Sequence, residues 1–326
     1  MSFAIKPVLG LADAIGTRAK TLRTLQGKMF ALFEENGFEE VIPPIIDRPE
    51  TLSSGAGRFL ADQTLVFSDP ADTGLLAIRS DMTPQIARIA ATRLQSEPVL
   101  KLCYSGTVIL ARPDARTASR QQWQMGVEYL GVADQSCDIE VMHLAAMAMH
   151  RAGFREPVLQ VGHIGLLKAL VSGSSKPVEF WAALLGRRSP DDVRAEIGKG
   201  RIDAVCGEAL VTMASGLADR RWLEAEAGKV NPAFDKAAGE LLKLVDAVAE
   251  RLSGEVEVCI DAAVTPRFFY HNGIVFSGFA AEASQALLHG GRYDEMMAAH
   301  GRDMPATGFS FDLWAWMDAA PNVSQD

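Results

Sequence analysis

Cysteines and long apolar runs are both scarce in this sequence. Its only four cysteines are Cys103, Cys137, Cys206 and Cys259, and no two of them form a CxxC pair. Such wide spacing indicates free thiols in a reducing compartment rather than disulfides or zinc. Nowhere do 18 apolar residues run together, and the N-terminus has no apolar segment followed by a small-residue cleavage site. We therefore expect a cytoplasmic protein with no membrane span and no secretory signal.

Basic residues are also in deficit. Lys and Arg number 32 against 41 Asp and Glu, so the formal net charge is −9. Because a nucleic-acid-binding surface normally neutralises phosphates with basic residues, this balance argues against such a function. Apolar residues make up 48% of the 326 residues, which suffices for one large domain or two smaller ones.

Common catalytic motifs are missing as well. The sequence contains no nucleophile elbow, Walker loop, HExxH or GxGxxG. It also lacks the paired acids before a Thr-Gly-Gly loop that many phosphoribosyltransferases use for their substrate. We therefore expect no metal site and no cofactor.

The apolar pattern predicts hairpins separated by helices. Residues 17–36 and 138–151 have apolar residues at helical spacing. Residues 64–79 read as two short strands joined by a turn, and the Asn272-Gly273 pair between apolar runs is typical of a type I′ hairpin. This order predicts an α+β fold in which helices flank a mostly antiparallel sheet.

The domain organisation follows from a change in composition. Residues 166–252 are rich in Ala, Leu, Lys, Arg and Glu and contain no convincing strand. We interpret them as a helical insertion in a core domain formed by residues 1–165 and 253–322. The adjacent Pro43 and Pro44 cannot lie in a central strand, so they mark an edge or an interface.

Asp81 and Thr83 lie where a predicted strand meets a predicted helix. Both could bind the ammonium group of a ligand, the carboxylate by charge and the hydroxyl by a hydrogen bond. The simpler interpretation is that Thr83 caps the helix and Asp81 interacts with the positive end of its dipole.

Two further segments have both a functional and a structural interpretation. In residues 123–131, strand alternation places Gln124 and Glu128 on one face, which is either a concave site or a solvated sheet surface. In residues 289–297, Arg292 follows a glycine pair. That segment is either functional or a loop with a salt-bridged arginine.

Five segments, taken together and in order, resemble the catalytic core of histidyl-tRNA synthetase, which has a class II aminoacyl-tRNA synthetase fold. The resemblance extends from about residue 7 to residue 318. GFEEVIPPIID resembles the first class II motif, which builds a dimer interface. The other segments are IRSDMTPQIAR, QMGVEYLG, FFYHNGIVF and GGRYDEM.

The resemblance implies a set of histidine-binding residues. Asp81 and Thr83 would bind the amino group, and Gln124 and Glu128 an ammonium or imidazole N–H. The remaining implied residues are Tyr270 and His271, which would form the wall beside the imidazole, and Arg267, which would bind the carboxylate.

The same resemblance implies a degenerate ATP site. The position of the phosphate-binding arginine falls on Ile109 or its neighbour Leu110, and its acidic partner falls on Ala111. In PATGFSFDLWAWM, Trp314 and Ala315 replace the Glu-Arg pair of the third motif. Near the hairpin, Pro266 and Phe269 also replace the synthetase's Arg and Asp. Amino-acid activation needs such cations, so we expect no catalytic residue.

A chain of this kind resembles the regulatory subunits of ATP phosphoribosyltransferase, the first enzyme of L-histidine biosynthesis. That resemblance implies a homodimer within a hetero-octamer, which activates the short-form catalytic subunit and mediates feedback inhibition by histidine. The sequence leaves no residues for a C-terminal anticodon-binding domain, so we expect no such domain and no tRNA partner. Two alternatives stay open: a shortened histidyl-tRNA synthetase or other amino-acid ligase of this fold, and a synthetase-like regulator of another partner.

Overall fold

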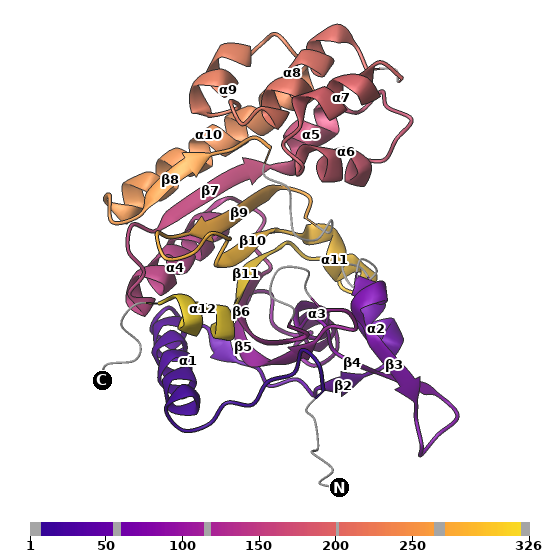
Figure 1. The fold of residues 1–326 in the computed structure, drawn as a ribbon, viewed down its shortest axis with the longest axis vertical. Coiled ribbons are helices and arrows are strands. Elements are labelled where there is room, and N and C mark those ends of the chain that lie inside the picture. Colours follow the sequence, from indigo (N-terminus) through magenta and orange to yellow (C-terminus); the bar gives the residue numbers. More distant parts are fainter. Residues whose placement is uncertain (1–7, 55–59, 114–118, 200–201, 264–270, 321–326) are drawn as a thin grey trace, which may run out of the picture.

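An eight-stranded mixed sheet runs through the molecule (Figure 1). The computed structural model describes residues 8–54, 60–113, 119–199, 202–263 and 271–320. The strands have the order β1-β5-β6-β11-β10-β9-β7-β8, so strands from both halves of the chain meet in the middle of the sheet. Their bounds are Glu39–Glu40 (β1), Leu100–Ile109 (β5), Gln121–Leu130 (β6), Ala306–Asp312 (β11), Leu288–Arg292 (β10), Ile274–Phe279 (β9), Val158–His163 (β7) and Glu257–Ile260 (β8).

Neighbouring strands in this sheet are antiparallel except at its two edges, where β1 pairs with β5 and β7 with β8 in parallel. A second, antiparallel sheet has the order β2-β4-β3, with bounds Ile46–Asp47 (β2), Leu65–Ser68 (β3) and Leu75–Ile78 (β4). The predicted hairpin over residues 64–79 is confirmed. Pro43 and Pro44 lie between the edge strands β1 and β2, where a missing N–H breaks no ladder.

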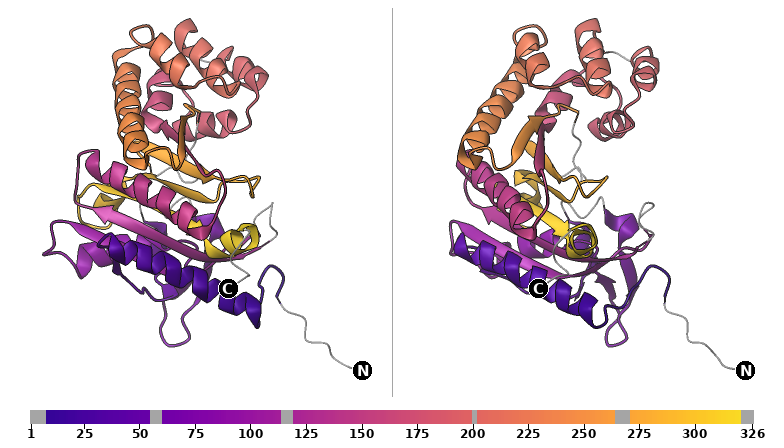
Figure 2. Two further views of the ribbon diagram at one scale, coloured as in Figure 1. Left: turned by 90° about the vertical axis from the view of Figure 1, so that its left-hand side faces the viewer. Right: turned by 60° about the vertical axis from the view of Figure 1, so that its left-hand side comes forward.

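Three long helices lie side by side over one face of the large sheet (Figures 1 and 2): α1 (Thr17–Glu35), α4 (Ser136–Ala152) and α10 (Pro232–Leu252). The short α12 (Leu313–Ala319) packs between α1 and β6. Buried apolar residues repeat every three or four positions along α10, which turns one stripe to the core. The predicted helices over residues 17–36 and 138–151 correspond to α1 and α4, and with the mostly antiparallel sheet they confirm the α+β fold.

The opposite face of the sheet is covered by shorter helices: α3 (Thr83–Thr92), α11 (Asp294–Ala299) and, next to α3, α2 (Pro49–Ser53). A second, smaller apolar core lies here and joins Ile86 of α3 and Met297 of α11 to Leu102 of β5. Because these helices are short, part of this face of the sheet is left for a pocket.

Five short helices follow β7 at one end of the sheet, at the top of Figure 1. Their bounds are Ile164–Leu170 (α5), Val178–Leu185 (α6), Pro190–Ile197 (α7), Ala204–Ala214 (α8) and Arg220–Glu226 (α9). Side chains of Ser189, Asp203 and Asp219 accept the first N–H groups of α7, α8 and α9. The subsequent α10 returns to the sheet and packs against β7 and β8. The limits proposed for the insertion, residues 166–252, remain a prediction.

All four cysteines are free, as predicted, and Cys103, Cys137 and Cys206 are buried. Among the described residues, no helix combines the length and the apolar character that crossing a bilayer requires.

The predicted N-cap of α3 is wrong by one residue. Met82 occupies the cap position, and Thr83 is the first residue of the helix. The Asp81 carboxylate accepts the backbone N–H of Thr83 at 3.1 Å. Asp81 therefore accepts a hydrogen bond at the N-terminus of α3, in accord with the simpler interpretation of Asp81.

Two predicted backbone conformations are also wrong. A type I′ turn needs positive φ at both central residues, and neither Asn272 nor Gly273 has it. The Asn272 N–H instead donates to the carbonyl of Arg292 at 3.0 Å, so this segment runs beside the end of β10. Likewise, the loop interpretation of residues 289–297 is wrong at its start, because residues 289–292 belong to β10 and pair with β11 and in part with β9.

Candidate functional site

A pocket opens on the face of the large sheet beside α3 and α11. Its cavity volume is only about 20 Å³, and the pocket is partly open to solvent. The helix α3 and the strands β5, β6, β10 and β11 each contribute a polar side chain to it. The polar side chains that line it are those of Thr83, Tyr104, Glu128, His271, His289, Tyr293 and Ser310.

Glycines make the floor of this pocket. Glu128 on β6 faces Gly308 on β11, and Gly308 in turn faces Gly291 on β10. A Cβ atom on Gly308 would collide with the Glu128 carboxylate, and one on Gly291 would lie 2.6 Å from the His271 ring. Glycine at both positions therefore leaves room for the functional side chains.

Glu128 is the central group of the pocket, and its side chain is fully enclosed. Strand alternation places it on the same face as Gln124, as predicted, and the residue is only 2% exposed. The Tyr104 hydroxyl donates to Glu128 Oε1 at 3.0 Å, and the Tyr293 hydroxyl donates to Oε2. Burial raises the pKa of Glu128 to about 8, although the hydrogen bonds from these tyrosines oppose the shift.

Asp81 and Gln124 form a second buried polar group next to Glu128. Gln124 Nε2 donates to Asp81 Oδ1 at 2.8 Å, and Gln124 Oε1 accepts the N–H of Met82 at 2.9 Å. The Thr83 hydroxyl lies 3.3 Å from both Asp81 Oδ1 and the Tyr104 hydroxyl. Hydrogen bonds therefore connect Asp81 to Glu128 through Thr83 and Tyr104.

Two histidines also border the pocket. His271 is 8% exposed, and its ring meets that of Tyr293 edge-on at 6.2 Å. His289 lies on β10 with Nδ1 3.1 Å from the Ser277 hydroxyl. The predicted ligands Arg267 and Tyr270, like Pro266 and Phe269, lie outside the described residues.

Sequence reasoning missed Tyr104, Tyr293 and His289. Tyr293 lies inside GGRYDEM, one of the segments that carry the resemblance, but the neighbouring Arg292 is the more obvious functional candidate in that segment. The residues around Tyr104 do not indicate a functional role, because a tyrosine among apolar residues of a strand is typical of a core. His289 directly precedes the glycine pair and could have been considered.

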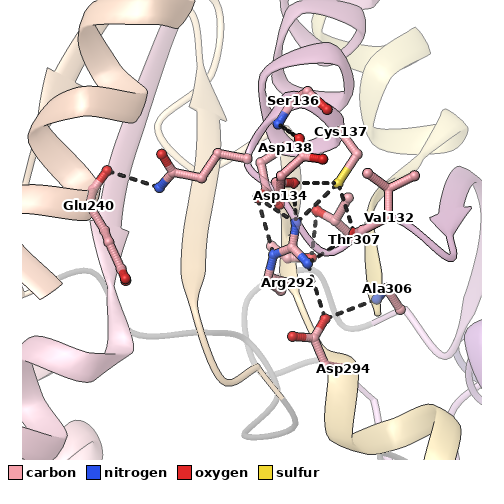
Figure 3. Close-up of polar contacts among 12 residues, drawn as sticks. Val132, Asp134, Ser136, Cys137, Asp138, Glu240, Arg292, Asp294, Ala306 and Thr307 are labelled. Carbon is pink, nitrogen blue, oxygen red and sulfur yellow. Dashed lines mark hydrogen bonds and ion pairs between the residues drawn. The ribbon is translucent and has the colours of Figure 1, made fainter. Parts of the chain in front are cut away.

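Arg292 has a structural role beside the pocket (Figure 3). Its guanidinium donates to Asp138 Oδ2 at 2.7 Å and 3.1 Å, to the carbonyl of Asp134 at 3.1 Å, and to Asp294 Oδ1 at 3.3 Å. Burial alone would lower the pKa of Arg292, but the Asp138 carboxylate raises it above the ordinary value. The salt-bridged interpretation of Arg292 is confirmed, and this cluster fixes the start of the segment that carries Tyr293.

The residues assigned to the degenerate ATP site lie elsewhere. Ile109 ends β5, and the N–H of Ala111 donates to the carbonyl of Gln63 at 2.7 Å. The Trp314 ring packs edge-on against Trp123 at 6.3 Å, whereas Ala315 is exposed on α12. None of the four assigned residues lines the described pocket, so their relation to nucleotide binding stays a prediction.

The chemistry of the pocket suits a small molecule with N–H groups. Glu128 lines the pocket, Asp81 is buried next to Thr83, and the described lining includes no lysine or arginine. Burial without a neighbouring cation favours the protonated form of Glu128, and a ligand ammonium or imidazolium would favour its ionised form. A triphosphate would instead need a positively charged site.

Comparisons with known proteins agree with this fold. The sequence model of the family described as histidyl-tRNA synthetase matches residues 10–315. A protein of Methylobacillus flagellatus named ATP phosphoribosyltransferase regulatory subunit is 35% identical over 317 residues, which cover 95% of this chain and 80% of that protein. A protein of the same name from Polynucleobacter necessarius is 34% identical over 95% of this chain and 81% of its own.

Solved structures show the same architecture. An ATP phosphoribosyltransferase regulatory subunit/histidyl-tRNA synthetase from Bacillus halodurans superposes with a TM-score of 0.87 at 24% identity, over 99% of this chain and 84% of that chain. A histidine–tRNA ligase subunit from Alicyclobacillus acidocaldarius gives a TM-score of 0.78 at 25% identity, over 100% and 99% of the two chains. The predicted class II synthetase-like fold is confirmed.

Proposed function

Because this chain belongs to the family of ATP phosphoribosyltransferase regulatory subunits, built on the histidyl-tRNA synthetase fold, we propose that it acts without a catalytic site of its own. In this proposal it assembles in the cytoplasm with the short-form catalytic subunit, activates the first step of L-histidine biosynthesis and mediates feedback inhibition by histidine. The observation that carries the proposal is the 35% identity to a regulatory subunit over 95% of the chain.

The proposed regulatory ligand is L-histidine, bound in the pocket beside Glu128. Asp81 and Thr83 would receive its amino group, and Gln124 and Glu128 an ammonium or imidazole N–H. Thr83 and Glu128 line one cavity, and Asp81 and Gln124 are connected to them by hydrogen bonds, which supports the assignment. His271 and Tyr270 would form the imidazole wall, and Arg267 would bind the carboxylate.

Regulation by histidine requires a difference in affinity. Histidine can shift the complex only if it binds its active and inhibited states unequally, and a coupling free energy of about 1–3 kcal/mol is ordinary.

Arg79, two residues before Asp81, donates to the carbonyls of Pro43 at 2.9 Å and Thr107 at 2.8 Å. This contact would link the pocket to the proline segment at the molecular surface.

The proposed lack of catalysis rests on synthetase cations that the resemblance expects and this sequence replaces. Adenylation of an amino acid develops charge on the phosphate, and loss of one preorganised donor costs about 10²–10³ in rate. The resemblance places the synthetase's Glu-Arg pair on Trp314 and Ala315, and its phosphate-binding arginine on Ile109 or Leu110. Such a site would leave negligible amino-acid activation.

A homodimer within a hetero-octamer is the proposed assembly. The proline segment and the small sheet expose a group of large apolar side chains, which a monomer would leave in water. The members of this apolar patch are Ile42 and Ile45 in the proline segment, Ile46 and Phe67 on one face of the small sheet, and Val66 and Leu75 on its other face.

Reconstitution with a catalytic subunit tests the proposal. The purified chain is mixed with a candidate phosphoribosyltransferase of about 200–230 residues, the size of one two-lobed core, and formation of phosphoribosyl-ATP is measured. The proposal predicts a complex, faster product formation with this chain, and slower formation after histidine is added. A catalytic subunit that neither binds this chain nor changes its rate would contradict it.

A second candidate function is amino-acid activation by a histidyl-tRNA ligase. The match to the histidyl-tRNA synthetase family over residues 10–315 favours it. Histidine-dependent exchange of pyrophosphate into ATP distinguishes the two, because only a ligase catalyses it. Clear exchange would establish the second candidate in place of the first.

A further inference from the structure

The segment that leads into α1 exposes large apolar side chains. Val8, Leu9 and Ile15 are 58%, 83% and 79% exposed. The segment itself is held against the protein, because the N–H of Arg120 donates to the carbonyl of Gly10 at 2.8 Å, next to the start of β6. It then continues directly into α1 (Figure 1). A group of apolar side chains exposed in this way indicates a surface that binds another protein.

The first half of α1 adds positive charge to this surface. Residues 17–28 contain four basic residues and no acidic one, in a chain whose formal net charge is −9. The four basic residues are Arg18, Lys20, Arg23 and Lys28, and all of them are exposed. Of these four, only Arg18 forms a salt bridge within the described part of the chain, with Asp318 at 3.2 Å.

These charges are opposite to those that would stabilise the helix. The N-terminus of a helix carries a partial positive charge, so acidic residues in the first turn stabilise it and basic residues do not. The first turn of α1 contains no acidic residue, and its last turn contains no basic residue but ends in Glu34 and Glu35. The basic residues at the start of α1 therefore do not contribute to its stability, which favours a role in binding.

Two tryptophans hold the arginines of this surface. The guanidinium of Arg18 lies 5.1 Å from the centroid of the Trp314 ring, and that of Arg23 lies 4.9 Å from the Trp123 ring. The Trp123 indole is itself fixed, because its Nε1 donates to the Ser105 hydroxyl at 2.9 Å. Arginine and tryptophan are enriched among the residues that contribute most to protein–protein binding, and side chains that are already ordered lose less entropy on association.

We propose that this amino-terminal surface, formed by Val8, Leu9, Ile15, Arg18, Lys20 and Arg23, binds an acidic and partly apolar surface of the catalytic subunit. Carboxylates of the partner would pair with the basic side chains, and its apolar side chains would cover the exposed apolar ones. The homodimer is assigned to the apolar patch on the small sheet, which belongs to other elements, so the amino-terminal surface is free for the second type of subunit. This inference rests on the proposed function and identifies the surface through which the two subunits assemble.

Binding of the candidate catalytic subunit to two variants tests the inference. Ile15→Asp and Lys20→Glu each introduce a carboxylate at the N-terminus of α1. Calorimetry at low and at high salt should show about tenfold weaker binding for each variant, and a smaller salt dependence for Lys20→Glu than for wild type. The thermal stability of both variants should be unchanged or higher, because a carboxylate at this end of a helix is favourable.

Lys243→Glu on the exposed side of α10 is the matched control and should bind the catalytic subunit as the wild type does. Lys20→Glu keeps the test valid if Ile15→Asp does not fold.

The outcomes separate the inference from the proposed function. Wild-type affinity in both variants would overturn the inference, while binding by the wild type upheld the proposed function. A wild type that does not bind the catalytic subunit would overturn both. If sedimentation velocity showed that Lys20→Glu loses self-association while its affinity for the catalytic subunit is unchanged, the surface would belong to a second copy of this chain, and the inference would be wrong.

Discussion

The Tyr104 hydroxyl donates a 3.0 Å hydrogen bond to the Glu128 carboxylate across two neighbouring strands. The same hydroxyl lies 3.3 Å from that of Thr83. Tyr104 therefore connects Glu128 on β6 to the segment between β4 and α3, where Asp81 lies. Among the described residues, neither Asp81 nor Glu128 has a salt bridge to a lysine or arginine. A cationic group of a ligand could therefore bind next to these two side chains.

Removing the Tyr104 hydroxyl should weaken ligand binding without unfolding the protein. Tyr104→Phe should lower histidine affinity about 5- to 30-fold, because Glu128 loses a donor that orients it. Calorimetry measures the change. Tyr129→Phe is the matched control, since Tyr129 is on β6 but on the opposite face. Equal effects of the two substitutions would show that the Tyr104 hydroxyl has no special role.

Glu128 should make folding stability depend on pH. Its pKa is raised to about 8 from an ordinary value of 4.5, so between these values the folded protein holds a proton that the unfolded chain has released. The free energy of unfolding therefore falls as pH rises from about 4.5 to 8, by at most about 1.4 kcal/mol per pH unit from this group. Glu128→Gln should remove this contribution.

Urea unfolding at pH 5, 6, 7 and 8 checks this dependence. The difference in slope between wild type and Glu128→Gln is the measured quantity, and Glu250→Gln on the exposed end of α10 is the control. Parallel stability curves for wild type and Glu128→Gln would mean that Glu128 is ionised throughout this range.

The sequence predicts most of the fold because its hairpins and helices follow local apolar periodicity. The hairpin β3–β4 and the helices α1 and α4 agree with their patterns. The type I′ turn predicted at Asn272-Gly273 is wrong, because the hydrogen bond from Asn272 to Arg292 determines the backbone there more strongly than local turn preference does.

The candidate site could be predicted only in part. Thr83, Glu128 and His271 were found through segments that resemble a known family, and they do line one pocket. Tyr104 and His289 reach that pocket through strand register between residues far apart in the chain. Periodicity within one strand cannot show which strands are neighbours.

Arg292 should be important for stability. Arg292→Met should lower the free energy of unfolding by about 3–5 kcal/mol, because it leaves the buried Asp138 carboxylate without its cation. Arg194→Met on α7 removes an arginine paired on the surface with Asp191, and should change stability by no more than about 0.5 kcal/mol. Chemical denaturation compares them. A loss below about 1 kcal/mol for Arg292→Met would contradict the structural role.

The apolar patch on the small sheet should mediate dimer formation. Phe67→Asp places a charge on the face of the small sheet that also carries Ile46, and should shift the isolated chain from dimer to monomer, because the carboxylate would be desolvated in the interface. Sedimentation velocity measures the distribution. Leu217→Lys, at another exposed apolar position, is the control and should leave it unchanged. A dimer that persists in Phe67→Asp would place the interface elsewhere.

The most direct test of the account measures phosphoribosyl-ATP formation by the reconstituted complex, with wild type or Glu128→Ala as the regulatory chain, over a range of histidine concentrations. The account predicts that both chains activate the catalytic subunit and that histidine inhibits only the wild-type complex strongly. Equal inhibition of both complexes by histidine would contradict it, because the regulatory ligand would then bind outside this pocket.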